Sequence, residues 1–251
     1  MGAAATVGQV VPRPGLGFEL EFVEVGGGHE RAPLAECWSR AFESAPPVRA
    51  FSFAKGSSNF PGWYWSATSG RHVGYESWLE RDHARLLDFD RSVIGFSSQP
   101  FRLSWDQDGR RRRHTPDFFA RRADGGGVVI DVRADDRIKP RDAEAFARTE
   151  RACAEVGWEF RRVGTPEAVF MANVRWLAGY RHPRCHRPAI AAALTRVFSR
   201  PAPLREGAER VGPVVAVLPA LFHLMWSGLL VADLRSAPLR ATSPVRAGDV
   251  G

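Results

Sequence analysis

A hairpin that carries two acids, residues 111–136, constrains the fold more than any other feature of the sequence. The segment RRRHTPDFFARRADGGGVVIDVRADD reads as a strand, a glycine-rich turn and a second strand. Asp117 follows a proline at the start of the first strand, and Asp131 stands within the apolar run VVIDV. An acid inside an apolar strand costs several kcal/mol unless a partner or a metal ion compensates its charge. The hairpin therefore predicts a sheet in which acids serve a purpose other than packing.

The segments around this hairpin predict an α/β fold with a mixed sheet. The chain upstream of the hairpin has an amphipathic run typical of a helix, followed by an extended stretch that Pro100 confines to an edge or bend. A helix, a strand and a second helix follow the hairpin. The predicted helices are 75–90, 140–156 and 165–180. The further predicted strands are 18–25, two short aromatic strands within 45–70, 92–105 and 158–163.

Composition predicts four parts. The predicted parts are a disordered Gly/Ala/Pro-rich tail (1–17), a β-rich extension packing on the core (18–74), the α/β core (75–180) and a C-terminal module (181–251). The stretch GYRHPRCHRP, residues 179–188, has the composition of a linker. Beyond it, two helix-like segments precede two short strands around a Ser-Ala-Pro turn. This order has the outline of a winged helix.

The net charge of +7 is concentrated in the C-terminal module. Residues 181–251 hold 10 basic and 4 acidic side chains, whereas residues 1–180 hold 25 and 24. A basic module attached to a neutral one indicates an anionic partner, for which DNA or RNA is the usual candidate. A basic solvated tail is the alternative. Only Lys55 and Lys139 are lysines, so the positive charge is almost entirely arginine.

The sequence argues against membrane and secreted classes of protein. No apolar run is long enough to span a bilayer, and the N-terminus lacks the pattern of a secretory signal. The three cysteines, Cys37, Cys153 and Cys185, are scattered and odd in number, which favours a reducing compartment and no zinc cluster. We therefore expect a cytoplasmic protein.

The acids of the hairpin have the chemistry of a magnesium site. Mg²⁺ prefers hard oxygen ligands, which Asp117, Asp131 and the backbone carbonyl of Val132 would supply. A third carboxylate could come from Glu80 or Glu76, which lie four residues apart on one side of the upstream helix. Side chains alternate along a strand, so Arg133 would lie on the same face as Asp131 and could hold a scissile phosphate.

This layout resembles the PD-(D/E)xK nucleases, with Pro116–Asp117 as the first motif and Asp131–Arg133 in place of D/E-x-K. Residues 75–163, YESWLERDHARLLDFDRSVIGFSSQPFRLSW through HTPDFFARR and GVVIDVR, further resemble the TnsA family of transposase endonuclease subunits. The resemblance implies a restriction-endonuclease-like core. It also selects Glu80, with Glu76 second, as the family glutamate ahead of Gln99.

The TnsA resemblance implies a metal-dependent endonuclease subunit that nicks DNA at transposon ends. It implies that Glu80, Asp117 and Asp131 hold Mg²⁺, with Mn²⁺ as a substitute. It also implies two protein partners, a DDE-type, TnsB-like transposase and a TnsC-like AAA+ ATPase regulator.

Arg133 departs from the family pattern, which has lysine at this position. A desolvated lysine can lose its proton and act as a base, whereas arginine effectively cannot. A general-base role is therefore lost at this position, while electrostatic stabilisation of a phosphate survives. Lys139, at the start of the next helix, is a second candidate for the lysine role.

Several interpretations compete with these assignments. Glu76 and Glu80 could form a solvated helix face, and Arg110–Arg113 could be a solvated turn or could contact DNA phosphates. The histidines His72, His83 and His114 lack partners at any ligand spacing, and Trp158 and Trp176 read as core. The whole chain could instead be a free-standing restriction or repair nuclease, or a DNA-binding transposition subunit whose catalysis is impaired.

Overall fold

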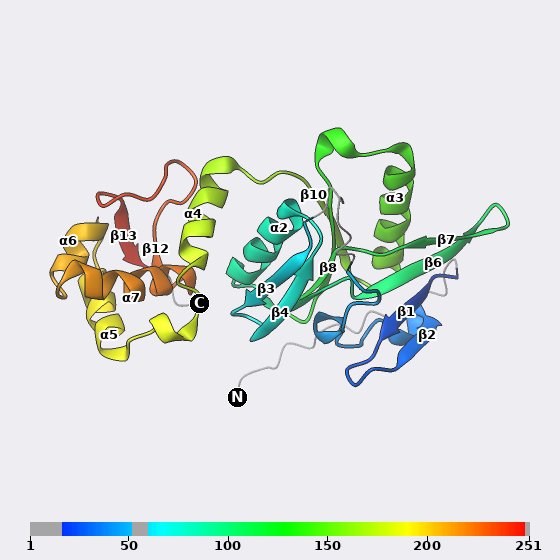
Figure 1. Ribbon diagram of the computed structural model, residues 1–251, viewed down its shortest axis with the longest axis horizontal. Coiled ribbons are helices and arrows are strands. Elements are labelled where there is room, and N and C mark those ends of the chain that lie inside the picture. Colours follow the sequence, from blue (N-terminus) through cyan, green and yellow to red (C-terminus); the bar gives the residue numbers. More distant parts are fainter. Residues whose placement is uncertain (1–16, 52–59, 249–251) are drawn as a thin grey trace, which may run out of the picture. The chain divides into compact units, whose positions relative to one another are not determined.

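The computed structural model describes residues 17–51 and 60–248, which contain seven α-helices and several β-sheets (Figure 1). The chain divides into two compact units. Unit 1 comprises Met1–Gly62, Val73–Glu76 and Ser92–Gly164, and unit 2 comprises Trp63–His72, Ser77–Arg91 and Thr165–Gly251. These units cut the chain differently from the predicted divisions at 74/75 and 180/181. The predicted disordered tail, except Gly17, lies outside the described residues.

Unit 1 is built on a four-stranded mixed sheet, as the hairpin pattern predicts. Its strand order is β10-β9-β8-β5, in which β5, β8 and β9 are antiparallel neighbours and β10 runs parallel to β9. Helix α3 (Pro140–Glu155) connects the two parallel strands. The strands are β5 (Val93–Ser98), β8 (Phe118–Arg122), β9 (Gly127–Val132) and β10 (Glu159–Val163). Every residue of β9 is buried, as expected for a continuous apolar run.

A second, fully antiparallel sheet of unit 1 joins the N-terminal strands to the centre of the chain. Its order is β2-β1-β6-β7, with β1 (Glu19–Val23), β2 (His29–Pro33), β6 (Phe101–Gln107) and β7 (Arg110–His114). The predicted turn over Arg110–Arg113 is wrong, because these arginines form β7. The turn consists of Asp108 and Gly109, whose φ angles of 51° and 70° suit a tight hairpin.

The core of unit 1 is an aromatic cluster around Phe42, which lies in a short 3-10 helix (Phe42–Ser44) that follows α1 (Leu34–Cys37). The Phe42 ring contacts Phe101, Phe119 and Trp158 at centroid distances of 5.1–5.8 Å. Trp158 is therefore a core residue, as predicted. The first residue of β9, Gly127, has no room for a side chain, because a Cβ there would lie 2.6 Å from the Trp158 ring.

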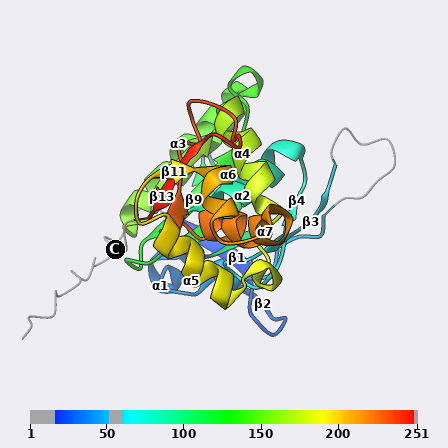
Figure 2. The ribbon, with the colours of Figure 1, turned by 90° about the vertical axis from the view of Figure 1, so that its left-hand side faces the viewer.

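Unit 2 contains most of the helices. Its elements are α2 (Trp78–Phe89), α4 (Ala168–Ala178), α5 (Pro188–Val197), β11 (Ala202–Pro203), α6 (Leu204–Glu209), α7 (Val214–Trp226), β12 (Leu230–Val231) and β13 (Pro244–Ala247). The apolar helix α7 packs against α4, α5 and α6 (Figure 2). The three short strands form a sheet in the order β11-β13-β12. A hairpin of β3 (Gly62–Ser66) and β4 (Arg71–Tyr75) has residues in both units.

The stretch 179–188 is not a break between compact units, contrary to its linker-like composition. It contains a 3-10 helix (Pro183–Cys185), and both its flanking helices belong to the same core. Arg181 donates to the carbonyl of Trp65, and the carbonyl of Tyr180 lies 2.8 Å from Nδ1 of His223. Trp176, predicted as core, is 55% exposed. None of the helices in the described segments is long and apolar enough to cross a membrane.

Candidate functional site

The end of the β8–β9 hairpin brings Asp117 and Asp131 together. Phe118 pairs with Ile130, so the next step of the same register sets Asp117 opposite Asp131. Opposite residues of an antiparallel pair have Cβ atoms about 5 Å apart. Oδ2 of Asp117 accepts a hydrogen bond of 2.7 Å from the backbone N–H of Val132, which holds this carboxylate against β9.

Asp131 is buried, and a histidine compensates its charge. Asp131 is 2% exposed, and its two carboxylate oxygens lie 2.8 and 3.0 Å from Nε2 of His114. His114 ends β7, so it reaches Asp131 from the second sheet. The interpretation that His114 lacks a partner is therefore wrong. The sequence shows only that a histidine stands three residues before Asp117, and this spacing does not identify Asp131 as its partner.

The packing of α3 shows on which side of the sheet Asp131 and His114 lie. Burial raises the pKa of Cys153 well above its usual range, and the nearby Asp131 carboxylate raises it further. Cys153 belongs to α3, and Phe146 of the same helix meets the His114 ring edge-on at 6.1 Å. The carboxylate and its histidine therefore lie on the α3 face of the sheet.

Gln99 is a strained residue beside Asp117. Its φ of 47° is in the left-handed region, which non-glycine residues rarely adopt. The backbone is fixed from both sides, because its N–H donates to the backbone carbonyl of Asp117 and its carbonyl accepts from the N–H of Val48, each at 2.9 Å. The side chain is buried, and its Oε1 has no hydrogen-bond partner among the described residues. An orphaned buried amide oxygen fits the donor chemistry of a hard cation or its water.

Arg133 extends β9 by one residue and carries an exposed side chain. Its N–H donates to Val163 at 2.9 Å, so the strand alternation places its side chain on the same face as Asp131. No ion pair holds the Arg133 guanidinium among the described residues. Its charge is therefore available to an anion. Lys139 is exposed at the N-cap of α3, and its backbone N–H donates to Asp142 at 3.2 Å.

These residues lie in a segment that matches a known family. Residues 90–164 match the family model described as TnsA-like endonuclease N terminal. Over these residues the chain is similar to the N-terminal domain of TnsA-like endonucleases. The match covers 75 of the 251 residues, from just after α2 to the end of β10, and no curated protein matches the chain. The predicted resemblance is confirmed for the segment that contains Asp117, Asp131 and Arg133.

The two candidate glutamates lie upstream of the TnsA-like match. Glu76 belongs to unit 1, where both its oxygens accept from Arg49 at 2.8 and 2.6 Å. Glu80 belongs to unit 2, at the start of α2, where Ser77 Oγ donates to it at 2.8 Å and accepts from its N–H. Ser77 is thus the N-cap of α2 and also binds the Glu80 side chain, which gives this glutamate a role in the start of the helix without a metal. An approach of Glu80 to the two aspartates stays a prediction.

Within residues 17–51 and 60–248, no three His, Cys, Asp or Glu side chains gather into a group that could hold a metal ion. The TnsA-like domain supplies two neighbouring carboxylates, of which one is bound to a histidine. A complete coordination sphere would need further oxygens, such as the carbonyl of Val132, a carboxylate from α2 or phosphate oxygens of DNA.

The predicted DNA-contacting arginines form the edge strand of the second sheet. Arg111 pairs with Glu19 and Asp106. Arg110, Arg112 and Arg113 are exposed, and none has an acidic partner in the described part of the chain. Alternation puts Arg110 and Arg112 on the same side of β7 as His114. The strand therefore presents positive charge in line with the residue that contacts Asp131.

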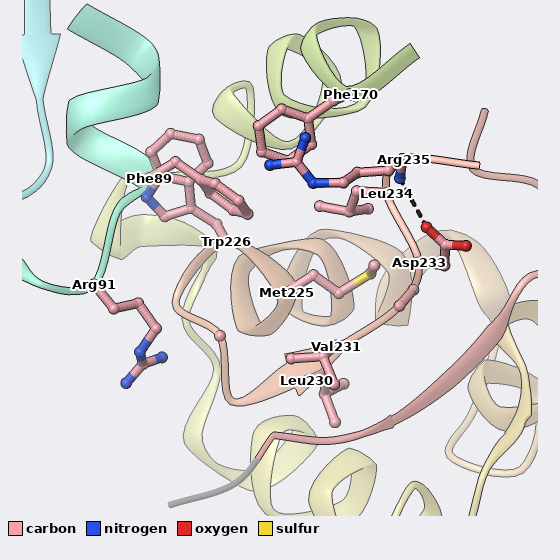
Figure 3. Close-up of a pocket in the computed structure, with 12 residues that line it drawn as sticks. Phe89, Arg91, Phe170, Met225, Trp226, Leu230, Val231, Asp233, Leu234 and Arg235 are labelled. Carbon is pink, nitrogen blue, oxygen red and sulfur yellow. Dashed lines mark hydrogen bonds between the residues drawn. The ribbon is translucent and has the colours of Figure 1, made fainter. Parts of the chain in front are cut away.

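Unit 2 holds a cavity of about 400 Å³, and none of the residues that line it belongs to the Asp117–Asp131 site (Figure 3). Phe89, Phe170 and Trp226 form its aromatic wall. Arg235 stacks over Phe170 at 4.2 Å, and Asp233 accepts the backbone N–H of Arg235 at 2.8 Å. The lining contains a single carboxylate, which is occupied by its own turn, so the cavity offers no pair of acids for metal chemistry.

Proposed function

We propose that the chain is a divalent-metal-dependent DNA endonuclease subunit of a TnsA-like heteromeric transposase, which nicks DNA at transposon ends. One observation carries the proposal: Asp117 and Asp131 are neighbours across a hairpin inside a TnsA-like endonuclease domain. Two adjacent carboxylates are costly without a cation, and phosphodiester cleavage is the chemistry that such a cation serves.

The residues of unit 1 fit part of a Mg²⁺ or Mn²⁺ site. Asp117 and Asp131 would provide carboxylate oxygens, Val132 a carbonyl, and Glu80 of α2 the third carboxylate. A bound metal would activate a water and polarise the phosphate. Arg133 would bind the scissile phosphate and stabilise the charge that develops on it, because its guanidinium is exposed and lies on the face of Asp131.

DNA would lie along β7 at this site. Arg110, Arg112 and Arg113 would contact backbone phosphates, which position a duplex without reading its sequence. Their exposure and their lack of acidic partners support this role. Affinity based on phosphate contacts falls steeply with salt, so binding by these arginines has a measurable signature.

We further propose that the C-terminal part of unit 2 is a winged-helix-like module. The order α5, β11, α6, α7, β12, β13 and the sheet β11-β13-β12 support this assignment. The third helix, α7, exposes apolar rather than basic side chains, and Val215 is 87% exposed. Any DNA contact would therefore come from arginines outside α7, such as Arg196 and Arg200. The apolar helix would instead suit a protein partner, either the DDE-type transposase or the AAA+ ATPase.

Nicking of labelled transposon ends in the assembled transposase tests the proposal. The wild-type chain should nick in Mg²⁺, and Asp117→Ala should not. Asp136→Ala is the matched control, because Asp136 is an exposed aspartate in the same domain. If Asp117→Ala nicks as fast as wild type, the assigned site is wrong. Nicking by the chain alone, without transposase, would favour the free-standing nuclease.

A catalytically impaired DNA-binding subunit is the second candidate function, and the arginine at position 133 favours it. Arginine cannot serve as a general base, so the site keeps only its electrostatic part. Metal binding without any nicking in the complete transposase would support this candidate. Restored nicking by Arg133→Lys would show that the substitution itself causes the impairment.

A further inference from the structure

The contact between His114 and Asp131 joins the two sheets of unit 1 at the candidate site. Leu103 of β6 pairs with His114 of β7, so the backbone position of the histidine is set by the second sheet. Asp131 belongs to the core sheet and faces its helix, α3. An ionised carboxylate only accepts hydrogen bonds, so the contact requires the proton on Nε2 of His114.

The histidine has few orientations available. Its side chain is 19% exposed, and the Phe146 ring packs against it from α3. Nε2 lies 2.8 Å from one oxygen of Asp131 and 3.0 Å from the other, so the two oxygens share the donor almost equally. Either oxygen can therefore leave the histidine for another partner while the other keeps the hydrogen bond.

Asp131 needs such a donor because it lies in an unfavourable place for a charge. It is nearly inaccessible to water, and Asp117 is its neighbour across the hairpin. A buried carboxylate is costly unless a hydrogen-bond donor compensates it, and His114 is that donor. A side chain that orients a carboxylate from outside the coordination sphere also fixes its direction toward a cation.

We propose that His114 is a positioning residue of the nuclease site, which holds the Asp131 carboxylate so that one of its oxygens can bind a divalent cation. The inference rests on the proposed function, since it takes Asp131 as a metal ligand. It assigns a role to a residue that the D/E-x-K pattern does not include. The contact made by the second sheet would then determine how well the first sheet binds metal.

Binding of Mn²⁺ to the full chain, without DNA or partner proteins, tests the inference by electron paramagnetic resonance. His114→Leu removes the donor and should weaken Mn²⁺ binding by about 10–100-fold, the usual loss for an orienting residue. His114→Gln keeps an N–H donor of similar reach and should stay within about threefold of wild type. His29→Leu changes an exposed histidine of the same unit and should leave Mn²⁺ binding unchanged.

Each outcome separates the inference from the proposed function. If Asp131→Asn loses Mn²⁺ but His114→Leu binds like wild type, the positioning role is refuted and the metal site stands. If wild type and Asp131→Asn bind Mn²⁺ equally well, the metal site fails and the inference fails with it. Imidazole nitrogen couplings in the Mn²⁺ spectrum would make His114 a ligand and overturn its positioning role. Thermal unfolding checks each fold, and His114→Asn, whose amide is shorter, replaces His114→Leu if that variant does not fold.

Discussion

Asp88 in unit 2 and Asp131 in unit 1 are both almost inaccessible to water, with side chains 0% and 3% exposed. Asp88 accepts four hydrogen bonds of 2.7–3.0 Å from the β3–β4 hairpin and its turn. The donors are the hydroxyls of Tyr64 and Ser66 and the backbone N–H groups of Ala67 and Thr68. Asp131 has one side-chain donor, His114, and a second acid beside it.

The difference teaches how to separate a structural acid from a functional one. The oxygens of Asp88 are occupied by groups that cannot leave without opening the hairpin, so its charge is compensated permanently. Asp131 shares one side-chain donor, His114, between its two oxygens and has Asp117 as its neighbour across the hairpin. Burial alone therefore does not distinguish the two acids, whereas incomplete compensation beside a second acid sets the proposed metal ligand Asp131 apart from Asp88.

The largest effect is expected for Asp131, on nicking activity and not on stability. Asp131→Asn should lower transposon-end nicking by about 100-fold or more, because the neutral amide is a poor metal ligand. Its stability should change by about 1 kcal/mol or less, since the amide oxygen can still accept from His114. Nicking assays and urea unfolding of the same preparation check both parts. An active Asp131→Asn variant would contradict the functional assignment.

The matching change in unit 2 should show the opposite pattern. In Asp88→Asn, the amide NH₂ would face hydrogen-bond donors, and the buried charge that those donors compensate would be gone. The free energy of unfolding should therefore fall by about 3 kcal/mol. Urea unfolding measures this loss, with Asp131→Asn as the control for a buried aspartate. Equal stability of the two variants would remove the distinction between them. At urea concentrations below its unfolding transition, the Asp88→Asn variant should bind Mn²⁺ as tightly as wild type does.

The hairpin was predictable from sequence because its information is local. The glycine-rich turn between two apolar strands fixes the register that brings Asp117 opposite Asp131. The contact of His114 was not predictable, because it depends on how a second sheet packs against the first. The strand Arg110–Arg113 was missed for another reason: four arginines show no apolar alternation, and the two-residue turn before them decides the pairing.

Unit 2 shows where composition misleads. Proline and arginine gave residues 179–188 the character of a linker, yet Arg181 stacks over Tyr64 at 4.7 Å and donates to the carbonyl of Trp65. A guanidinium can pack on an aromatic ring and still satisfy its donors, so arginine does not exclude a folded segment. The helices on either side were predictable because their apolar residues recur over ten or more positions.

The side chain of Arg133 provides a finer test of the site in unit 1. Arg133→Ala should lower nicking by about 10–100-fold, because it removes a charge that would stabilise the phosphate in the transition state. Arg133→Lys should keep or raise nicking, since the positive charge remains. Arg137→Ala, an exposed arginine after the same strand, is the control. Equal nicking by Arg133→Ala and wild type would show that Arg133 does not touch the reacting phosphate.

The arginines of the two units can be compared directly through salt dependence. Replacing Arg110, Arg112 and Arg113 by glutamine should lower DNA affinity and reduce the slope of log K against log salt by about 2–3, at about 0.9 for each lost phosphate contact. The pair Arg196→Gln and Arg200→Gln tests unit 2 in the same way. Fluorescence anisotropy with a duplex of fixed length measures both. An unchanged slope for the β7 variant would place the DNA away from this strand.

The smallest effect concerns Tyr64, one of the four donors to Asp88. Tyr64→Phe removes a hydrogen bond of 2.7 Å and should cost about 1 kcal/mol at neutral pH, because three donors remain. Burial raises the pKa of the Tyr64 hydroxyl far above its usual value, and the Asp88 charge raises it further.

This shift predicts an alkaline dependence that the variant should lack. Below pH 10 the hydroxyl is protonated in both states, so its stabilisation is complete. Above pH 10 the unfolded chain loses the proton while the folded chain keeps it, and the free energy of unfolding falls by up to about 1.4 kcal/mol per pH unit. The buried thiols contribute equally to wild type and Tyr64→Phe, so the difference between their urea unfolding curves at pH 9 and 11 isolates Tyr64. Parallel pH dependence of the two proteins would mean that folding does not raise the pKa of the Tyr64 hydroxyl.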